Sequence, residues 1–245
     1  MDTIVVIPAR YGSSRFEGKV LAKQTGKYLL QHTYERVLCA KTVQKVLIAT
    51  DDDRVMDACQ EFQAPCVMTS IEHQSGTDRI AEAVKDLNVD IIVNLQADEP
   101  EIQPGYIDRV AELLMNNPDA AMATLLAPFE NAEQVSNPNI VKAITDMKGK
   151  AIYFSRSVIP FNRQAAGVGP VNHYKRHLGI YAYRKSFLME YTSLTPSFLE
   201  CSEKLEQLRA IENGYIIQTA MVGKAWDGID TVEQYTEFVN RNKQG

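Results

Sequence analysis

The chain has 245 residues, 45% of them hydrophobic and 23% charged, and its formal net charge is −5. This composition is that of a folded protein whose core needs neither metals nor disulfides for stability. The negative net charge argues against a protein that coats nucleic acid, because binding to phosphates needs a broad basic face.

Three features bear on where the chain works. It contains no run of 18 apolar residues, so we expect no membrane span. The first residues, 1–3, lack the basic region of a signal peptide, which predicts a cytoplasmic protein. The four cysteines show neither CxxC pairing nor zinc-ligand spacing, so we expect reduced thiols in the core: Cys39, Cys59, Cys66 and Cys201.

Short apolar runs alternate with amphipathic stretches in the first part of the chain. The pattern predicts strands at 3–7, 45–49, 65–69 and 90–95, and helices at 29–41, from about 52, and at 77–87. Such alternation indicates βαβ units and an α/β fold with a mostly parallel sheet.

After about residue 120 the pattern changes. It predicts strands at 121–125, 140–144, 151–154 and 176–184 with little helix between them, an exposed loop or arm at 160–173, and a helix at 199–213 ended by Gly214. We therefore expect one domain over 1–245 with a small antiparallel insertion.

The loop after the first strand is rich in cations and glycine. Arg10, Arg15 and Lys19 lie within ten residues, at the carboxyl end of a strand where open parallel sheets bind ligands. Glycines let backbone N–H groups turn toward a ligand, and cations neutralise phosphates. We therefore favour a phosphate-binding loop over an ordinary basic loop. It is neither a Walker loop nor a GxGxxG dinucleotide loop.

Two acidic segments are candidate metal sites. Asp98 follows the strand at 90–95 and therefore faces the same edge as the first loop, where a carboxylate suits Mg²⁺; a simple turn explains it equally well. Asp230 precedes Thr231 and Glu233, and it could be only a helix N-cap. The acids at 51–53 are explained by helix capping, and we place them outside the catalytic set.

The second part of the chain carries two arginines and a strand with two ring side chains that are candidates for binding a small molecule. Arg156 and Arg163 could each bind a carboxylate through two N–H groups. His177 and Tyr181 lie on one face of a predicted strand, which could also be an ordinary half-buried strand. His173 and His177 do not form a helical zinc pair, because the segment is a predicted strand.

Residues 7–15, IPARYGSSR, resemble the opening signature of sugar cytidylyltransferases, and nearly residue for residue that of the CMP-KDO synthetase (3-deoxy-manno-octulosonate cytidylyltransferase) family. Further matches are QADEP at 96–100, SGTDR at 75–79 and WDGIDT at 226–231. The resemblance implies a Rossmann-like nucleotidyltransferase sandwich, with a nucleotide-binding part at about 1–120 and a sugar-binding and dimerisation part at about 121–225.

The resemblance also implies roles for individual residues. Arg10, Lys19 and Asp98 would be catalytic, and Asp98 and Asp230 would bind Mg²⁺. The nucleotide side would comprise Ala9, Arg10, Ser14, Arg15, Lys19, Ser75, Arg79 and Gln96. The sugar side would comprise Gln96, Arg156, Arg163, His177, Tyr181, Glu206 and Gln207.

The implied reaction is attack of the anomeric hydroxyl of 3-deoxy-manno-octulosonate (KDO) on the α-phosphorus of CTP, for lipopolysaccharide synthesis. The implied assembly is a homodimer with small-molecule substrates and neither nucleic acid nor membrane as partner. Three alternatives remain open: an 8-amino-KDO enzyme, a sialic acid enzyme, and a homologue that binds nucleotide or sugar without catalysis. Glu17 stands where the family usually has proline, and we expect its charge to weaken CTP binding, so that Glu17→Pro lowers the KM for CTP.

Overall fold

The computed structural model describes residues 1–13 and 15–243, which form two compact units. The first unit comprises residues 1–108 and 226–245, and the second comprises residues 109–225. The first unit is therefore built from two separate stretches of the chain. Ser14, one of the expected nucleotide-binding residues, lies outside the described residues.

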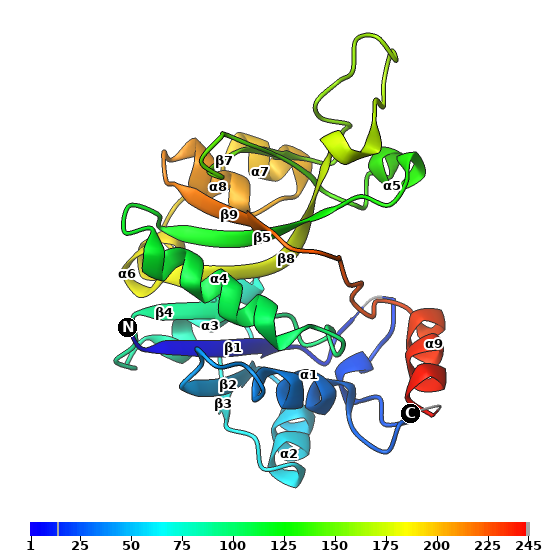
Figure 1. Ribbon diagram of the computed structural model, residues 1–245. Helices are drawn as coiled ribbons and strands as arrows, with labels where there is room; N and C mark the ends of the chain where they lie inside the picture. The colour runs from blue at the N-terminus through cyan, green and yellow to red at the C-terminus, as the bar shows by residue number, and fades with distance from the viewer. Residues whose placement is uncertain (14, 244–245) are drawn as a thin grey trace. The chain divides into compact units, whose positions relative to one another are not determined.

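The first unit is built on a four-stranded parallel sheet in the order β3-β2-β1-β4, with strands β1 (Thr3–Ala9), β2 (Lys45–Thr50), β3 (Cys66–Met68) and β4 (Ile91–Asn94). All seven residues of β1 are buried, as expected of a central strand covered on both faces. Figure 1 shows α1 (Leu29–Val37) in front of this sheet and α3 (Gly76–Val84) behind it. The expected parallel α/β pattern is confirmed here.

Three further helical segments complete this unit: the short 3₁₀ turn η1 (Lys19–Leu21), α2 (Asp53–Glu61) and α9 (Val232–Asn242). Phe238 and Val239 of α9 pack against Leu29 of α1, which ties the end of the chain to its beginning. The boundary between the units falls within α4 (Pro104–Asn116). The sequence pattern predicted neither α4 nor the extent of α9.

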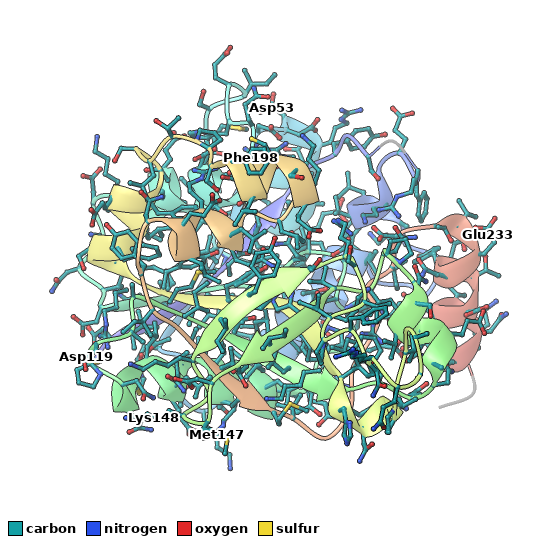
Figure 2. The ribbon with its side chains drawn as sticks, turned by 90° about the horizontal axis from the view of Figure 1, so that it is seen from above. Asp53, Asp119, Met147, Lys148, Phe198 and Glu233 are labelled. Atoms are coloured by element: carbon teal, nitrogen blue, oxygen red, sulfur yellow. The ribbon has the colours of Figure 1, made fainter. Side chains whose placement is uncertain are left out.

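The second unit has a mixed sheet, with strands β5 (Met122–Pro128), β6 (Lys142–Thr145), β7 (Ala151–Ser155), β8 (Lys175–Arg184) and β9 (Ile217–Met221). β5 pairs antiparallel with β8 and parallel with β9, and β6 pairs antiparallel with β7. Met147 and Lys148 project outward from the turn between β6 and β7 (Figure 2). The expected antiparallel portion is confirmed, whereas β9 was not predicted.

The helices of the second unit are α5 (Ala132–Ser136), α6 (Lys185–Tyr191), α7 (Phe198–Glu203) and α8 (Gln207–Glu212), with a 3₁₀ turn η2 (Val171–His173). The single helix expected at 199–213 is wrong, because Lys204 adopts φ 53° and ends α7 before α8 begins. The left-handed conformation breaks the ladder of helical hydrogen bonds. Apolar spacing alone did not reveal this break.

The expectations for the cysteines and for membrane-spanning helices can now be compared with the structure. Cys59 is buried, but Cys39 and Cys201 are exposed, so the expectation that all four thiols lie in the core is wrong. In the part of the chain that the structure describes, every helix is too short or too polar to cross a bilayer.

Candidate nucleotide-binding site

A polar pocket of about 400 Å³ lies at the carboxyl edge of the parallel sheet in the first unit. It is lined by Pro8, Arg10, Gly12, Ser13, Arg15, Lys19, Val20, Gly76, Gln96, Ala97, Asp98 and Asp230. These residues come from the end of β1, the loop after it and η1, from the start of α3, from the loop after β4 and from the segment before α9. They meet because parallel strands bring their carboxyl ends to one edge.

Lys19 joins the two acidic segments. Its Nζ donates to Asp98 Oδ2 at 2.5 Å, to Asp230 Oδ1 at 3.0 Å and to the backbone oxygen of Ile229 at 3.0 Å. Burial opposes the charged ammonium, but the carboxylates of Asp98 and Asp230 outweigh it, so the pKa of Lys19 lies above its usual value. Lys19 is therefore a cation held in the pocket wall by both expected metal ligands.

The two arginines of the first loop are held at different points of the pocket. Arg10 donates through NH2 to the backbone oxygen of His73 at 2.9 Å. Arg15 is 64% exposed and lies 3.0 Å from Asp230 Oδ2. Three cations and two carboxylates therefore line one pocket, which leaves it with an excess of positive charge suited to a polyphosphate.

Asp230 is positioned by the start of α9. Thr231 is the N-cap of this helix, and its hydroxyl accepts from the backbone N–H of Gln234. The Oε1 of Gln234 accepts from the backbone N–H of Asp230 at 2.7 Å. The alternative that Asp230 is the cap is wrong, because Thr231 fills that position and the carboxylate of Asp230 binds Lys19 and Arg15 instead.

The loop carrying Asp98 is fixed to the segment before α9. Ile229 N donates to Asp98 O at 2.8 Å, and Trp226 Nε1 donates to Glu99 Oε2 at 2.8 Å. Burial, reinforced by the neighbouring charge of Asp98, raises the pKa of Glu99 to about 8. These contacts explain how residues more than 120 positions apart converge on one pocket.

The remaining nucleotide candidates lie at or near this pocket, with one exception. Gln96 lines the pocket and donates to Asn94 Oδ1 at 3.1 Å. Ala9 is buried between two lining residues, and Ser75 caps α3 next to Gly76. The exception is Arg79, which is fully buried and pairs with Asp51 and Thr69 rather than lining the pocket. Its guanidinium therefore holds the loop after β3 to the end of β2.

Helix capping, which we expected to explain the acids at 51–53, is confirmed for Asp52 alone. Asp52 accepts from the backbone N–H of Arg54 and caps α2, while Asp51 pairs with Arg79. Sequence reasoning missed Pro8, Gly12, Ser13, Val20, Gly76 and Ala97 as pocket-lining residues. Only their positions in the sequence could have identified them, because each is adjacent or close to a predicted residue at the edge of the sheet.

The expected sugar-side residues all belong to the second unit except Gln96. His177 and Tyr181 lie on one face of β8 with ring centroids 5.4 Å apart, as the spacing predicted. Burial lowers the pKa of His177 to about 3, so its imidazole is neutral at pH 7. Thr124 Oγ1 lies 3.1 Å from its Nε2.

The other sugar-side candidates surround the break between α7 and α8 or lie on the 160–173 loop. The guanidinium of Arg156 donates to backbone oxygens of Glu203, Pro138 and Lys204. Gln207 is buried, and its Nε2 has no hydrogen-bond partner within the described residues. Glu206 is exposed at the start of α8, and Arg163 is exposed in the turn closed by the bridge between Asn162 and Gly167.

A parallel sheet with phosphate-suited cations and paired carboxylates at its carboxyl edge defines a nucleotide-binding α/β protein. Residues 4–220 match the cytidylyltransferase family model. A 3-deoxy-manno-octulosonate cytidylyltransferase of Trichlorobacter lovleyi is 42% identical over all of both chains, and one of Pseudomonas syringae pv. syringae is 46% identical over 98% of each.

Solved structures agree with these relatives. A CMP:2-keto-3-deoxy-manno-octonic acid synthetase complexed with CTP superposes with a TM-score of 0.93 at 39% identity, covering 100% of this chain and 99% of the other. A cytidylyltransferase from Leptospira borgpetersenii, at 20% identity and a TM-score of 0.65, shares the fold over 100% of this chain and 88% of that one. The chain therefore belongs to the cytidylyltransferase family, and within it to the 3-deoxy-manno-octulosonate cytidylyltransferases.

Proposed function

We propose that this chain transfers CMP from CTP to the anomeric hydroxyl of KDO and releases pyrophosphate. The observation that carries the proposal is the pocket in which Arg10, Arg15 and Lys19 face Asp98 and Asp230 at the carboxyl edge of the sheet. Its charge suits a nucleoside triphosphate, and a relative at 39% identity is a synthetase complexed with CTP.

The proposed reaction is a direct displacement at the α-phosphorus. The bond from the sugar oxygen to phosphorus forms, the bond to the β-phosphate oxygen breaks, and the hydroxyl proton leaves to a base or water. Arg10 and Lys19 neutralise the charge that develops on the departing pyrophosphate. Asp98, which lines the same pocket, would orient the attacking hydroxyl.

The acidic residues of the pocket fit Mg²⁺. Asp98 and Asp230 both reach the single ammonium of Lys19, so two hard oxygen ligands approach one cation together. The described residues contain no group of three or more His, Cys, Asp or Glu side chains able to hold a metal, and a two-carboxylate set suits Mg²⁺, which usually adds phosphate oxygens and waters. When bound, Mg²⁺ would neutralise the triphosphate and polarise its phosphoryl oxygens.

The sugar is proposed to bind to side chains of the second unit. The unpaired, buried amide nitrogen of Gln207 supports this role, because a buried donor without a partner is costly unless a ligand or water accepts its proton. The neutral imidazole of His177 and the hydroxyl of Tyr181 offer hydrogen bonds to sugar oxygens. Arg163 is exposed and suits the sugar carboxylate, whereas the guanidinium of Arg156 already donates to three backbone oxygens.

Membership of this family also supports a proposal about where the protein acts and how it assembles. We propose a cytoplasmic homodimer that supplies CMP-KDO for lipopolysaccharide synthesis. KDO is preferred over its 8-amino analogue because the only acidic side chain among the sugar-side candidates is Glu206, and the resemblance assigns that glutamate to ordinary KDO as well. Equal amounts of both sugars with limiting CTP test the preference, and a product dominated by the amino sugar would reverse it.

The function is tested by pyrophosphate release with CTP, Mg²⁺ and KDO. We expect release only with all three present, and Asp98→Asn should lower turnover by orders of magnitude because it removes a charge from the pocket with little change in volume. The matched control is Asp119→Asn, since Asp119 is exposed in the second unit (Figure 2). No pyrophosphate from the unaltered chain, or normal turnover of Asp98→Asn, would contradict the proposal.

A further inference from the structure

A backbone hydrogen bond joins the two ends of the cation-rich segment between β1 and η1. Gly18 N donates to Tyr11 O at 3.0 Å. Arg10 and Lys19, the two cations proposed to neutralise the pyrophosphate, stand immediately outside this contact in sequence. The Tyr11–Gly18 hydrogen bond therefore holds the backbone next to Arg10 close to the backbone next to Lys19.

The ring of Tyr11 lies directly against Gly18. A Cβ placed on Gly18 would come within 3.0 Å of ring carbons of Tyr11, and Gly18 has φ +65°. Both the close approach and the backbone conformation require glycine at this position. The ring is thus part of the contact between Tyr11 and Gly18, and its orientation matters to the residues on either side.

An arginine from a different element holds that ring. The guanidinium carbon of Arg54, on α2, lies 3.3 Å from the centroid of the Tyr11 ring. Asp52 fixes the guanidinium through two hydrogen bonds, from Nε to Oδ1 at 2.9 Å and from NH2 to Oδ2 at 2.6 Å. Asp53, labelled in Figure 2, marks the end of α2 from which Arg54 extends.

From these contacts we infer that Arg54 is a positioning residue for the reaction: anchored on Asp52, it braces Tyr11 and thereby fixes Arg10 and Lys19 for the triphosphate. Arg54 does not line the pocket, so it acts through Tyr11 and not on the nucleotide. The expected effect on CTP binding rests on the proposed function. The brace, which is the contact of the Arg54 guanidinium with the Tyr11 ring, does not depend on that function.

The charge of Glu17 contributes, after Asp52 and Tyr11, to raising the pKa of the exposed Arg54 guanidinium. The expectation that loss of the Glu17 charge improves CTP binding stays a prediction.

The test compares two arginines that differ in one respect. Arg54 and Arg241 are both more than half exposed and both bind a carboxylate through two nitrogens, but within the described residues only Arg54 of the two stacks on an aromatic ring. We expect Arg54→Ala to weaken CTP binding in titration calorimetry by about three- to fivefold, the size of one exposed cation–π contact. Arg241→Ala should leave it unchanged.

Kinetics separate positioning from general stability. Arg54→Ala should raise the KM for CTP and lower kcat, because Arg10 and Lys19 also act on the departing pyrophosphate, and it should leave the KM for KDO unchanged. Its thermal midpoint should fall no further than that of Arg241→Ala, which loses the same kind of ion pair. Arg54→Lys should resemble Arg54→Ala, because an ammonium lacks the planar fork that binds Asp52 and stacks on Tyr11.

A second measurement is independent of the proposed function. Trypsin cleaves after Arg15 within the loop, and without nucleotide we expect Arg54→Ala to be cleaved there several times faster than the unaltered chain or Arg241→Ala. Unchanged CTP affinity together with unchanged cleavage would overturn the inference. If the unaltered chain binds no CTP, the proposed function fails, and the cleavage rate alone decides whether the brace exists.

Discussion

Arg79 is a fully buried cation that needs its partner. Its guanidinium pairs with Asp51 at the end of β2 and with Thr69 after β3, and both partners belong to the first unit. A buried ion pair contributes little net stability, but removing one partner leaves the other charge uncompensated in a medium that solvates it poorly. The family resemblance placed Arg79 near the nucleotide, and the structure gives it this role behind the pocket.

Asp51→Asn should therefore destabilise the protein by about 3 kcal/mol, because it leaves the Arg79 guanidinium without a counter-charge. Denaturant unfolding measures this free energy. Asp53→Asn is the control, since Asp53 is exposed in the first turn of α2 and its loss should cost only about 0.5 kcal/mol. Equal effects of the two substitutions would contradict the assigned role of Arg79.

His177 makes stability depend on pH. Burial lowers its pKa to about 3 in the folded protein, against about 6.5 for an unperturbed histidine. The unfolded chain therefore binds a proton more readily than the folded chain below pH 6.5. The stability associated with neutral His177 is fully present above that pH and is lost progressively as the pH falls toward 3.

We expect the free energy of unfolding to fall by up to about 2 kcal/mol between pH 7 and pH 5 through this residue. The measurement is denaturant unfolding at both pH values for the unaltered chain and for His177→Gln, in which the fall should shrink by that amount. His173→Gln is the control because His173 is exposed. An unchanged pH dependence in His177→Gln would show that this imidazole titrates normally.

At the scale of elements, α9 is both a structural helix and the support of a site residue. Its capping box uses Thr231 and Gln234, and Gln234 also binds the backbone N–H of Asp230. Phe238 and Tyr235 anchor the helix in the core beside Leu29, and Phe16 of the phosphate loop packs on Tyr235 with centroids 5.6 Å apart. The N-cap of α9 and the position of Asp230 in the pocket therefore depend on the same side chain, that of Gln234.

Thr231→Ala should lower stability by about 1 kcal/mol, the usual cost of losing an N-cap, and should also weaken CTP binding because Asp230 loses its fixed position. The matched control is Ser197→Ala, which removes the same kind of capping box from α7 in the second unit. It should cost similar stability and leave CTP affinity unchanged. Equal CTP affinities of Thr231→Ala and Ser197→Ala would show that the N-cap of α9 does not position Asp230 for CTP binding.

At the scale of the whole molecule, the pocket joins distant parts of the chain. Its lining residues run from Pro8 to Asp230, and both stretches of the first unit contribute to it. A ligand that binds only when these segments are together must stabilise their association.

CTP at one hundred times its dissociation constant should therefore stabilise the protein by about 2.7 kcal/mol, observed as a higher thermal unfolding midpoint. Cytidine at the same concentration is the control and should give a much smaller shift, because it lacks the phosphates that the three cations bind. The opposite order of shifts would place the cations outside the binding site.

Much of this protein could be predicted from the order of its residues. The alternation of apolar runs predicted the strands of the parallel sheet, because hydrophobic periodicity reflects burial directly. The cations after β1 and Asp98 after β4 could be placed together for the same reason, since carboxyl ends of parallel strands share an edge. The pairing of His177 with Tyr181 followed from the two-residue period of a strand.

Other features were decided only by tertiary structure. The break at Lys204, the cap at Thr231 and the burial of Arg79 all depend on which partners the folded chain provides. Arg79 is the plainest example: its guanidinium is fully buried, and its counter-charge comes from Asp51, 28 positions earlier in the sequence. Sequence patterns report local periodicity, whereas the electrostatic effect of a side chain depends on neighbours that only folding brings together.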